Sequence, residues 1–192
     1  MMRKLICLLS WLIATTSIAF GQCDIVFDEV DDFDSVRTVA AAHVNMGNMI
    51  PSLFETVDGP KIIEQGKAMF MYSEKDSISS FFLLLAISEY GYHPIDSGQN
   101  VLLKLSDGEV VGLHNFPDDG QFDKTTNMRV YSHACVVPLD LFYRLTDTYI
   151  EQIRINYRKK KQTIKLSKEQ QEAIRAAVEC VGTKIGVYPV KP

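Results

Sequence analysis

The sequence lacks the features that mark several protein classes. No internal repeat, low-complexity tract or Pro/Ser-rich linker divides its 192 residues, and 7 prolines, 11 glycines and 46% apolar residues are ordinary for a globular chain. Collagen-like and disordered classes are therefore excluded. A basic surplus is also missing, because 20 Lys and Arg face 24 Asp and Glu, so no nucleic-acid partner is expected. At this length we expect one globular domain with its own core, over residues 22–192.

Short catalytic motifs are absent as well. The chain has no Gly-x-Ser-x-Gly, no His-Glu-x-x-His, no Cys-x-x-Cys and no Gly-rich loop of the kind that holds phosphates. No cofactor is therefore expected. Any site has to be assembled by the fold from residues that are distant in the sequence.

The first 21 residues are predicted to be a secretory signal peptide. Arg3 and Lys4 precede an uncharged apolar stretch, Leu5–Phe20, and Ala19 and Gly21 supply the small residues that signal peptidase requires. The stretch has 16 residues, fewer than the roughly 18 that span a bilayer, and no second one of that length follows, so no transmembrane span is expected in the mature chain. With 18 basic and 24 acidic residues left, the mature charge is 18 − 24 = −6. A lipid on Cys23 is the alternative, disfavoured because Gln22 is large for the preceding position.

Three cysteines remain after signal removal, Cys23, Cys135 and Cys180, so at most one internal disulfide can form. Three pairings are possible, and three separate thiols compete with all of them. We predict Cys23–Cys180, because that bond would fasten the mature N-terminus to the end of the last predicted helix. Cys135 lies in a predicted strand, Arg129–Val137, and is expected to be buried there.

Most of the predicted elements are strands. A hairpin is expected at Val101–Leu105 and Val110–Leu113, around an Asp107-Gly108 turn of type I′. Alternating apolar residues predict a strand over Tyr149–Arg158, with Glu151 as the exception, then a Lys159–Lys161 turn and a partner strand, Gln162–Leu166. Val36–Val44 and Ala68–Tyr72 also indicate strands, and the apolar run Phe81–Ile87 indicates a buried central one. Asn45–Gly66 and Asn115–Asn127 are expected to be long irregular segments.

Two helices complete the prediction. Ser167 and Gln170 form a capping-box pattern at the start of a helix over Lys168–Val181, with Gly182 just past its end. A shorter helix is expected to begin at Pro138. The fold class that follows is α+β, a mainly antiparallel β-sheet or open sandwich with the C-terminal helix packed on one face.

Three groups of residues are candidate sites. His93, His114 and His133 lie on or beside predicted strands and could converge on a metal, although surface or strand-end histidines are the simpler interpretation. Arg158, Lys159, Lys160 and Lys161 form a basic turn that could bind an anionic partner, or could only discourage aggregation at a sheet edge. Tyr90 and Tyr92 flank a loop that could stack on a sugar or a protein when exposed, or close the core when buried.

Leu103–Gly108, Ile150–Ile155 and the signal end Ala19–Gln22 resemble a loose set of small exported proteins of unknown function from Bacteroidota. The resemblance covers about residues 95–181. It implies export from a Gram-negative cell and an antiparallel sheet with a terminal helix, and it transfers no catalytic residue.

These observations together favour an exported, non-catalytic binding or accessory module of the periplasm or cell surface, with an envelope protein or a glycan as its partner. The alternative is a small extracytoplasmic hydrolase, metal-dependent or not, whose residues converge from loops around the three histidines.

Overall fold

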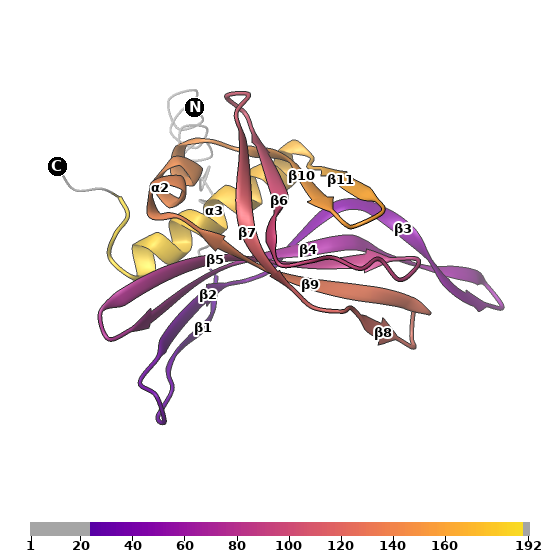
Figure 1. Ribbon diagram of the computed structural model, residues 1–192, viewed down its shortest axis with the longest axis horizontal. Helices are drawn as coiled ribbons and strands as arrows, with labels where there is room; N and C mark the ends of the chain where they lie inside the picture. The colour runs from indigo at the N-terminus through magenta and orange to yellow at the C-terminus, as the bar shows by residue number, and fades with distance from the viewer. Residues whose placement is uncertain (1–23, 190–192) are drawn as a thin grey trace, which may run out of the picture.

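The computed structural model describes residues 24–189, so the predicted signal peptide and Cys23 lie outside the described residues. The strands are β1 (Ile25–Val30), β2 (Arg37–Ala41), β3 (Val44–Thr56), β4 (Gly59–Lys75), β5 (Ile78–Glu89), β6 (Gly98–Leu105), β7 (Val110–Pro117), β8 (Gln121–Asp123), β9 (Met128–Val137), β10 (Ile150–Asn156) and β11 (Lys161–Lys165). The helices are α2 (Leu139–Asp147) and α3 (Lys168–Lys184) (Figure 1).

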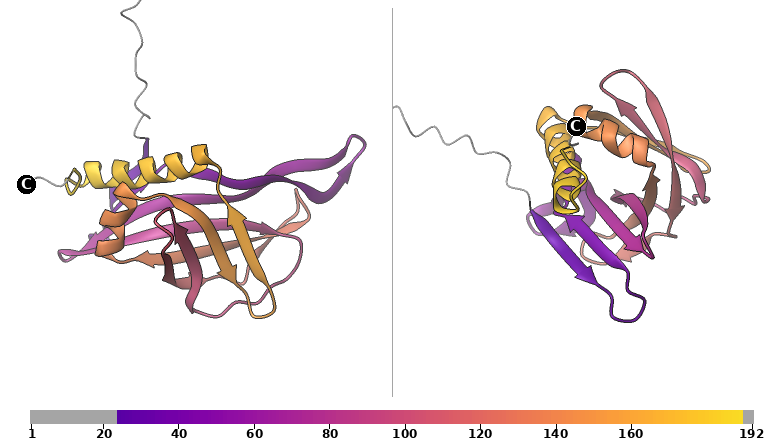
Figure 2. Two further views of the ribbon diagram at one scale, coloured as in Figure 1. Left: turned by 90° about the horizontal axis from the view of Figure 1, so that it is seen from above. Right: turned by 90° about the vertical axis from the view of Figure 1, so that its left-hand side faces the viewer.

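These strands form one antiparallel sheet in the order β1-β2-β4-β5-β9-β7-β6-β10-β11, with β3 also paired to β4 and β8 to β9. The sheet is strongly curved, and α3 lies along its inner side (Figure 2). The predicted α+β class, the antiparallel sheet and the C-terminal helix are confirmed. Between residues 24 and 189, no helix is both long and apolar enough to cross a bilayer.

β5 shows how the sequence produces the two faces of the sheet. Phe81, Leu83, Leu85 and Ile87 alternate with half-buried neighbours and point into the core, where each is at most 4% exposed. Since side chains alternate across a strand, Phe82, Leu84 and Ala86 point to the outer face. The predicted central strand is confirmed, but its continuous apolar run covers both faces, and the outer face is covered only in part.

α3 begins with the predicted capping box. The Ser167 side chain accepts from the Gln170 N–H, and the Gln170 side chain accepts from the Ser167 N–H. The predicted helix end was wrong, because α3 continues to Lys184 through Gly182. A Cβ at Gly182 would lie 2.8 Å from atoms of Phe142 and Tyr188, so this glycine permits close packing instead of ending the helix.

The helices cover one end of the inner face. α2 follows Pro138 as predicted and buries Leu141, Phe142 and Leu145. The Phe142 ring stacks on Phe81 with the centroids 4.3 Å apart and on Phe70 at 5.9 Å. Apolar side chains of α3 complete this core, which burial of apolar surface stabilises.

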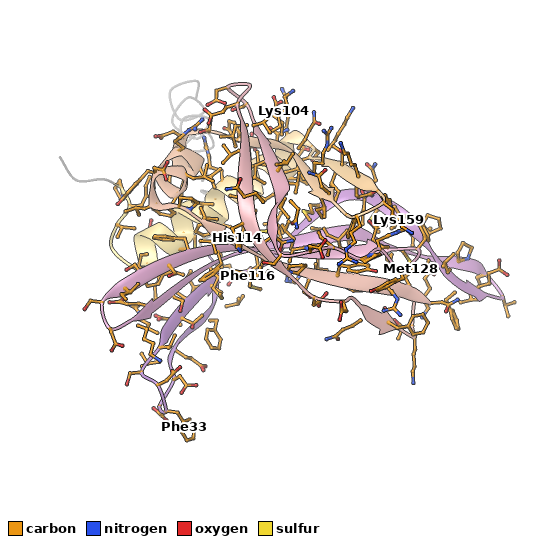
Figure 3. The ribbon with its side chains drawn as sticks, viewed as in Figure 1. Phe33, Lys104, His114, Phe116, Met128 and Lys159 are labelled. Carbon is orange, nitrogen blue, oxygen red and sulfur yellow. The ribbon has the colours of Figure 1, made fainter. Side chains whose placement is uncertain are left out.

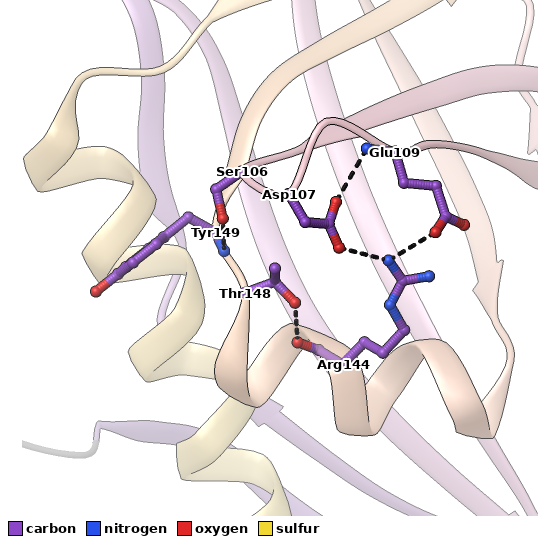
Figure 4. A network of polar contacts seen from close by, with 6 residues as sticks. All are labelled: Ser106, Asp107, Glu109, Arg144, Thr148 and Tyr149. Atoms are coloured by element: carbon purple, nitrogen blue, oxygen red, sulfur yellow. Dashed lines mark hydrogen bonds and ion pairs between the residues drawn. The ribbon is translucent and has the colours of Figure 1, made fainter.

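The β6–β7 hairpin is confirmed, although its turn is not of type I′. That type needs two residues with positive φ, whereas only Gly108 in this turn has one, +91°. The turn is held against α2 by Arg144, whose guanidinium lies 2.8 Å from Asp107 Oδ2 and 2.9 Å from Glu109 Oε2 (Figure 4). The Glu109 N–H and then Arg144 hold the pKa of Asp107 below its usual value.

Asn45–Gly66 is not an irregular segment, which corrects the prediction. It lies within the long hairpin of β3 and β4, which extends beyond the body of the molecule at one end (Figure 1). Pro51 is tolerated because β3 is an edge strand there, so its missing N–H removes no bond to a further strand. The acidic segment of residues 24–34 contains β1 and the turn of the β1–β2 hairpin, with Phe33 at its exposed tip (Figure 3).

Candidate functional site

A cleft of about 460 Å³ lies on the outer face of the sheet, over β4, β5, β9 and the end of β7. This face points away from the core that α3 covers. The volume falls within the range of roughly 300–1,000 Å³ typical of small-molecule sites. The cleft therefore has the size of a ligand site without being part of the hydrophobic core.

Strand register explains the floor of the cleft. Met69, Leu84, Ala134 and Phe116 are cross-strand partners on β4, β5, β9 and β7, so they form one apolar row across the sheet. Ala134 is small and stands between larger neighbours. Together with Ala86 in the next row, it leaves a hollow that the side chains of Met69, Leu84 and Phe116 border.

The next row is polar. Lys67, Ala86 and Ser132 are cross-strand partners on β4, β5 and β9, and Asp118 continues the row by donating its N–H to the Ser132 carbonyl oxygen at 3.1 Å. His43, at the corner between β2 and β3, also lines this side. The cleft is therefore apolar along one row and polar along the adjacent one.

The sequence prediction missed this cleft. The available signal was Phe81–Ile87, where apolar residues occupy both faces of a strand instead of one. Complete burial of the strand on both faces is the interpretation that this run favours. The alternative, a central strand whose second face lines an apolar cleft, gives the same pattern, so only the pairing of β5 with β4 and β9 distinguishes them.

A second group, the polar cluster, lies inside the curve of the sheet at the end of β5 opposite the phenylalanine stack. Its members are Glu89, His93, Tyr131, His133, Tyr157 and Lys160. The alternation of β5 and β9 points Glu89 and His133 inward, and Tyr157, directly after β10, is also buried; the three are 2%, 1% and 5% exposed.

The polar cluster joins two segments that are far apart in the sequence. Lys160 Nζ, from the β10–β11 turn, lies 2.6 Å from Glu89 Oε2, and His93 Nε2 lies 3.8 Å from the same oxygen. Arg158 in that turn pairs with Asp96 in the β5–β6 loop. A buried carboxylate needs such a partner because leaving water is costly for a charge. The pairs hold the β5–β6 loop against the β10–β11 turn.

His133 is the most perturbed histidine. Burial lowers its pKa to about 4, so the ring is neutral at pH 7. Its Nδ1 lies 3.1 Å from the side-chain nitrogen of Asn115, which also donates to Asn100. Nδ1 is then the acceptor, and the ring proton is on Nε2. Burial, followed by the Glu89 charge, raises the pKa of Tyr157, so this phenol stays protonated.

The residues predicted to bind a partner fall into two groups. Lys160 is half-buried and holds Glu89, so it serves the fold and not only solubility. Tyr90 and Tyr92 are 48% and 57% exposed. The side chains of Arg158, Lys159 and Lys161 are exposed as well (Lys159 in Figure 3). The loop that follows Tyr92 packs against the basic turn, because the Arg158 N–H donates to the Pro94 carbonyl oxygen and Arg158 pairs with Asp96, so we call this region the rim.

The three histidines proposed as metal ligands do not come together. His93 and His133 belong to the polar cluster, whereas His114 lies on the outer face of β7 beside Phe116, with the ring centroids 4.7 Å apart (Figure 3). Across residues 24–189, no three His, Cys, Asp or Glu side chains are grouped so that they could hold a metal ion. The cleft and the polar cluster are the arrangements that remain.

Comparison with protein-family models, curated proteins and solved structures finds no match to this chain. The cleft offers an apolar floor with few polar groups, which suits binding. The polar cluster is enclosed and its charges are paired, which suits holding the loop in place.

Proposed function

We propose that this chain is an exported, non-catalytic binding module of the cell envelope, and that it holds a small, largely apolar ligand in the outer cleft. The observation that carries the proposal is the cleft of about 460 Å³. An apolar hollow with a few convergent polar groups is the usual form of a ligand site. Export rests on the signal-peptide pattern of residues 1–21.

A neutral fluorescent probe, phenylnaphthylamine, tests the cleft. Its emission is expected to rise on binding to the mature protein. Ala134→Phe places a large ring in the apolar row and is expected to weaken probe binding at least tenfold. Ser80→Phe is the matched control, because Ser80 lies on the same outer face but does not line the cleft. Both variants are first checked for cooperative unfolding.

Two results would reject the proposal. The first is no probe uptake by the folded wild-type protein. The second is equal loss in Ala134→Phe and Ser80→Phe, which would mean that the probe binds the whole outer face and not the cleft.

The envelope partner, a protein or a glycan, is expected at the rim of Tyr90, Tyr92, Arg158, Lys159 and Lys161. Tyrosine and arginine are enriched in recognition surfaces, and exposed lysines can attract an anionic partner. In crosslinked envelopes, Tyr90→Ala combined with Tyr92→Ala is expected to reduce partner recovery while probe binding in the cleft stays unchanged. Unchanged recovery would remove the rim from the proposal.

A further inference from the structure

The cleft is lined by an apolar row of side chains and, next to it along the strands, by a polar row. The apolar row of Met69, Leu84 and Ala134 and the polar row of Lys67 and Ser132 are separated by two residues along each strand, which is about 6.6 Å. A ligand that fills the cleft therefore lies on both rows. Such a ligand needs an apolar part and a polar part. Its apolar part contacts the apolar row and its polar part contacts the polar row.

The charges of the polar row are not equivalent. Asp118 Oδ1 accepts the N–H groups of Gly120 at 2.9 Å and Ser132 at 3.1 Å, so the protein itself holds this carboxylate in place. Lys67 is exposed, and none of the hydrogen bonds or ion pairs within residues 24–189 involves its ammonium. Lys67 therefore offers a ligand a positive charge that no ion pair within the described residues occupies.

Lys67 and Asp118 are also at opposite ends of the row. β5 and β9 lie between them, and the three steps from β4 to the end of β7 amount to about 14 Å along the sheet. His43 lines the cleft on the Lys67 side, where its imidazole can donate a further hydrogen bond to an anion. A negative group at Lys67 is thus far from the carboxylate that would repel it.

We propose that the ligand of the cleft is an anionic single-chain amphiphile, a long-chain carboxylate. Its carboxylate lies at Lys67 and His43, and its hydrocarbon chain lies on the row of Met69, Leu84, Ala134 and Phe116. This inference rests on the proposed function, because it names the ligand class of the same cleft. Asp118 positions the loop after β7 at the other end and takes no part in binding the head.

Three ligands with the same twelve-carbon chain separate the charge from the chain: dodecanoate, dodecanol and dodecylammonium. Each competes with phenylnaphthylamine for the mature protein, below its micelle concentration. Dodecanoate is expected to displace the probe at about tenfold lower concentration than dodecanol, since one charge-assisted hydrogen bond is worth about 1.4 kcal/mol or more. Dodecylammonium is expected to be the weakest.

Variants then assign the preference to a residue. Lys67→Gln is expected to remove the difference between dodecanoate and dodecanol by weakening dodecanoate binding. Lys159→Gln makes the same chemical change at an exposed lysine that does not line the cleft, and is expected to keep the difference. Added salt is expected to weaken dodecanoate only.

The outcomes distinguish this inference from the proposed function. Equal displacement by dodecanoate and dodecanol, or the strongest displacement by dodecylammonium, would overturn the anionic head group and leave an apolar cleft. A preference for dodecanoate that survives in Lys67→Gln would also overturn it. If none of the three ligands displaces the probe, the cleft is not an amphiphile site; if the wild-type protein takes up no probe at all, the proposed function fails first.

Discussion

At the scale of single residues, the buried neutral His133 links stability to pH. Its pKa of about 4 in the folded state is below the value of 6.5 for an unperturbed histidine. Between these two values the unfolded chain binds a proton that the folded chain does not, so stability falls as the pH is lowered. Between about pH 7 and pH 5 this one residue is expected to cost about 2 kcal/mol of unfolding free energy.

Urea unfolding at the two pH values measures that loss. Other groups titrate as well, so the comparison is between variants. His133→Gln is expected to lose about 2 kcal/mol less than the wild-type protein between the two pH values. His114→Gln is the control, because His114 is exposed on the outer face, and it is expected to behave as wild type. An unchanged pH dependence in His133→Gln would contradict the assignment.

Lys160 is a second residue whose effect follows from burial. Removing it leaves the Glu89 carboxylate, 2% exposed, without its ammonium partner at 2.6 Å. Breaking a buried pair costs roughly 3–5 kcal/mol, and because Lys160 itself is partly solvated we expect about 3 kcal/mol for Lys160→Met. Lys159→Met, at an exposed neighbour, is expected to cost less than about 0.5 kcal/mol. Chemical denaturation measures both, and equal costs would show that the pair contributes little.

At the scale of elements, Gly47 lies at the contact of β3 with β11 and the start of α3. Its φ is +75°, and a Cβ there would lie 2.4 Å from Gln65 Oε1 and 2.8 Å from the Ile164 side chain on β11. The Gln170 side chain bonds both the N–H and the carbonyl oxygen of Gly47, which ties the start of α3 to β3. There is thus room here only for glycine.

Gly47→Ala is expected to destabilise the protein by about 3 kcal/mol or more, from roughly 1–2 kcal/mol of backbone strain and a similar cost of overpacking. Gly59→Ala separates the two causes, because Gly59 has φ +95° but open space around it. It is expected to cost about 1–2 kcal/mol, the strain alone. Thermal unfolding compares the two variants, and equal costs would show that the contacts of Gly47 can relax.

Local patterns predicted most of the elements, and their exceptions have local causes. The capping box, the helix after Pro138 and the β10 alternation are confirmed because each depends on neighbours in the sequence. Glu151 broke the alternation because the register of β10 against β6 shifts between Ile150 and Gln152, and a bulge changes which face later residues occupy. The long β3–β4 hairpin was missed because an edge strand tolerates Pro51, so proline there is no evidence of a loop.

At the scale of the whole molecule, the site could not be predicted because it depends on pairing between distant segments. β5 pairs with β9, which places Ala134 beside Leu84. The alternation of apolar residues within either strand does not predict which strand it pairs with. The same pairing places His133 on the opposite face of the sheet from the cleft floor. The sequence therefore showed which residue types are present. Which of them meet in the cleft and in the polar cluster depends on the pairing of the strands, which the sequence did not predict.

A disulfide between Cys23 and Cys180 stays a prediction, because Cys23 lies outside the described residues. Cys135 is buried as a free thiol, and burial raises its pKa to about 12, which makes it unreactive. Asp28, five residues after Cys23 in the sequence, pairs with Lys184 of α3 at 3.0 Å, so β1 lies against the end of the helix that carries Cys180.

Closing a loop of more than 150 residues is expected to stabilise the oxidised protein by roughly 4–5 kcal/mol in the chain-entropy description. Reduction should therefore lower the melting temperature. Cys135→Ser is expected to keep that response to reductant, whereas Cys23→Ser is expected to remove it. Peptide mapping without reduction is the direct measurement, and it should recover Cys23 linked to Cys180. Recovery of Cys23 linked to Cys135, or of three free thiols in protein exported to an oxidising compartment, would show that the two ends are not joined in this way.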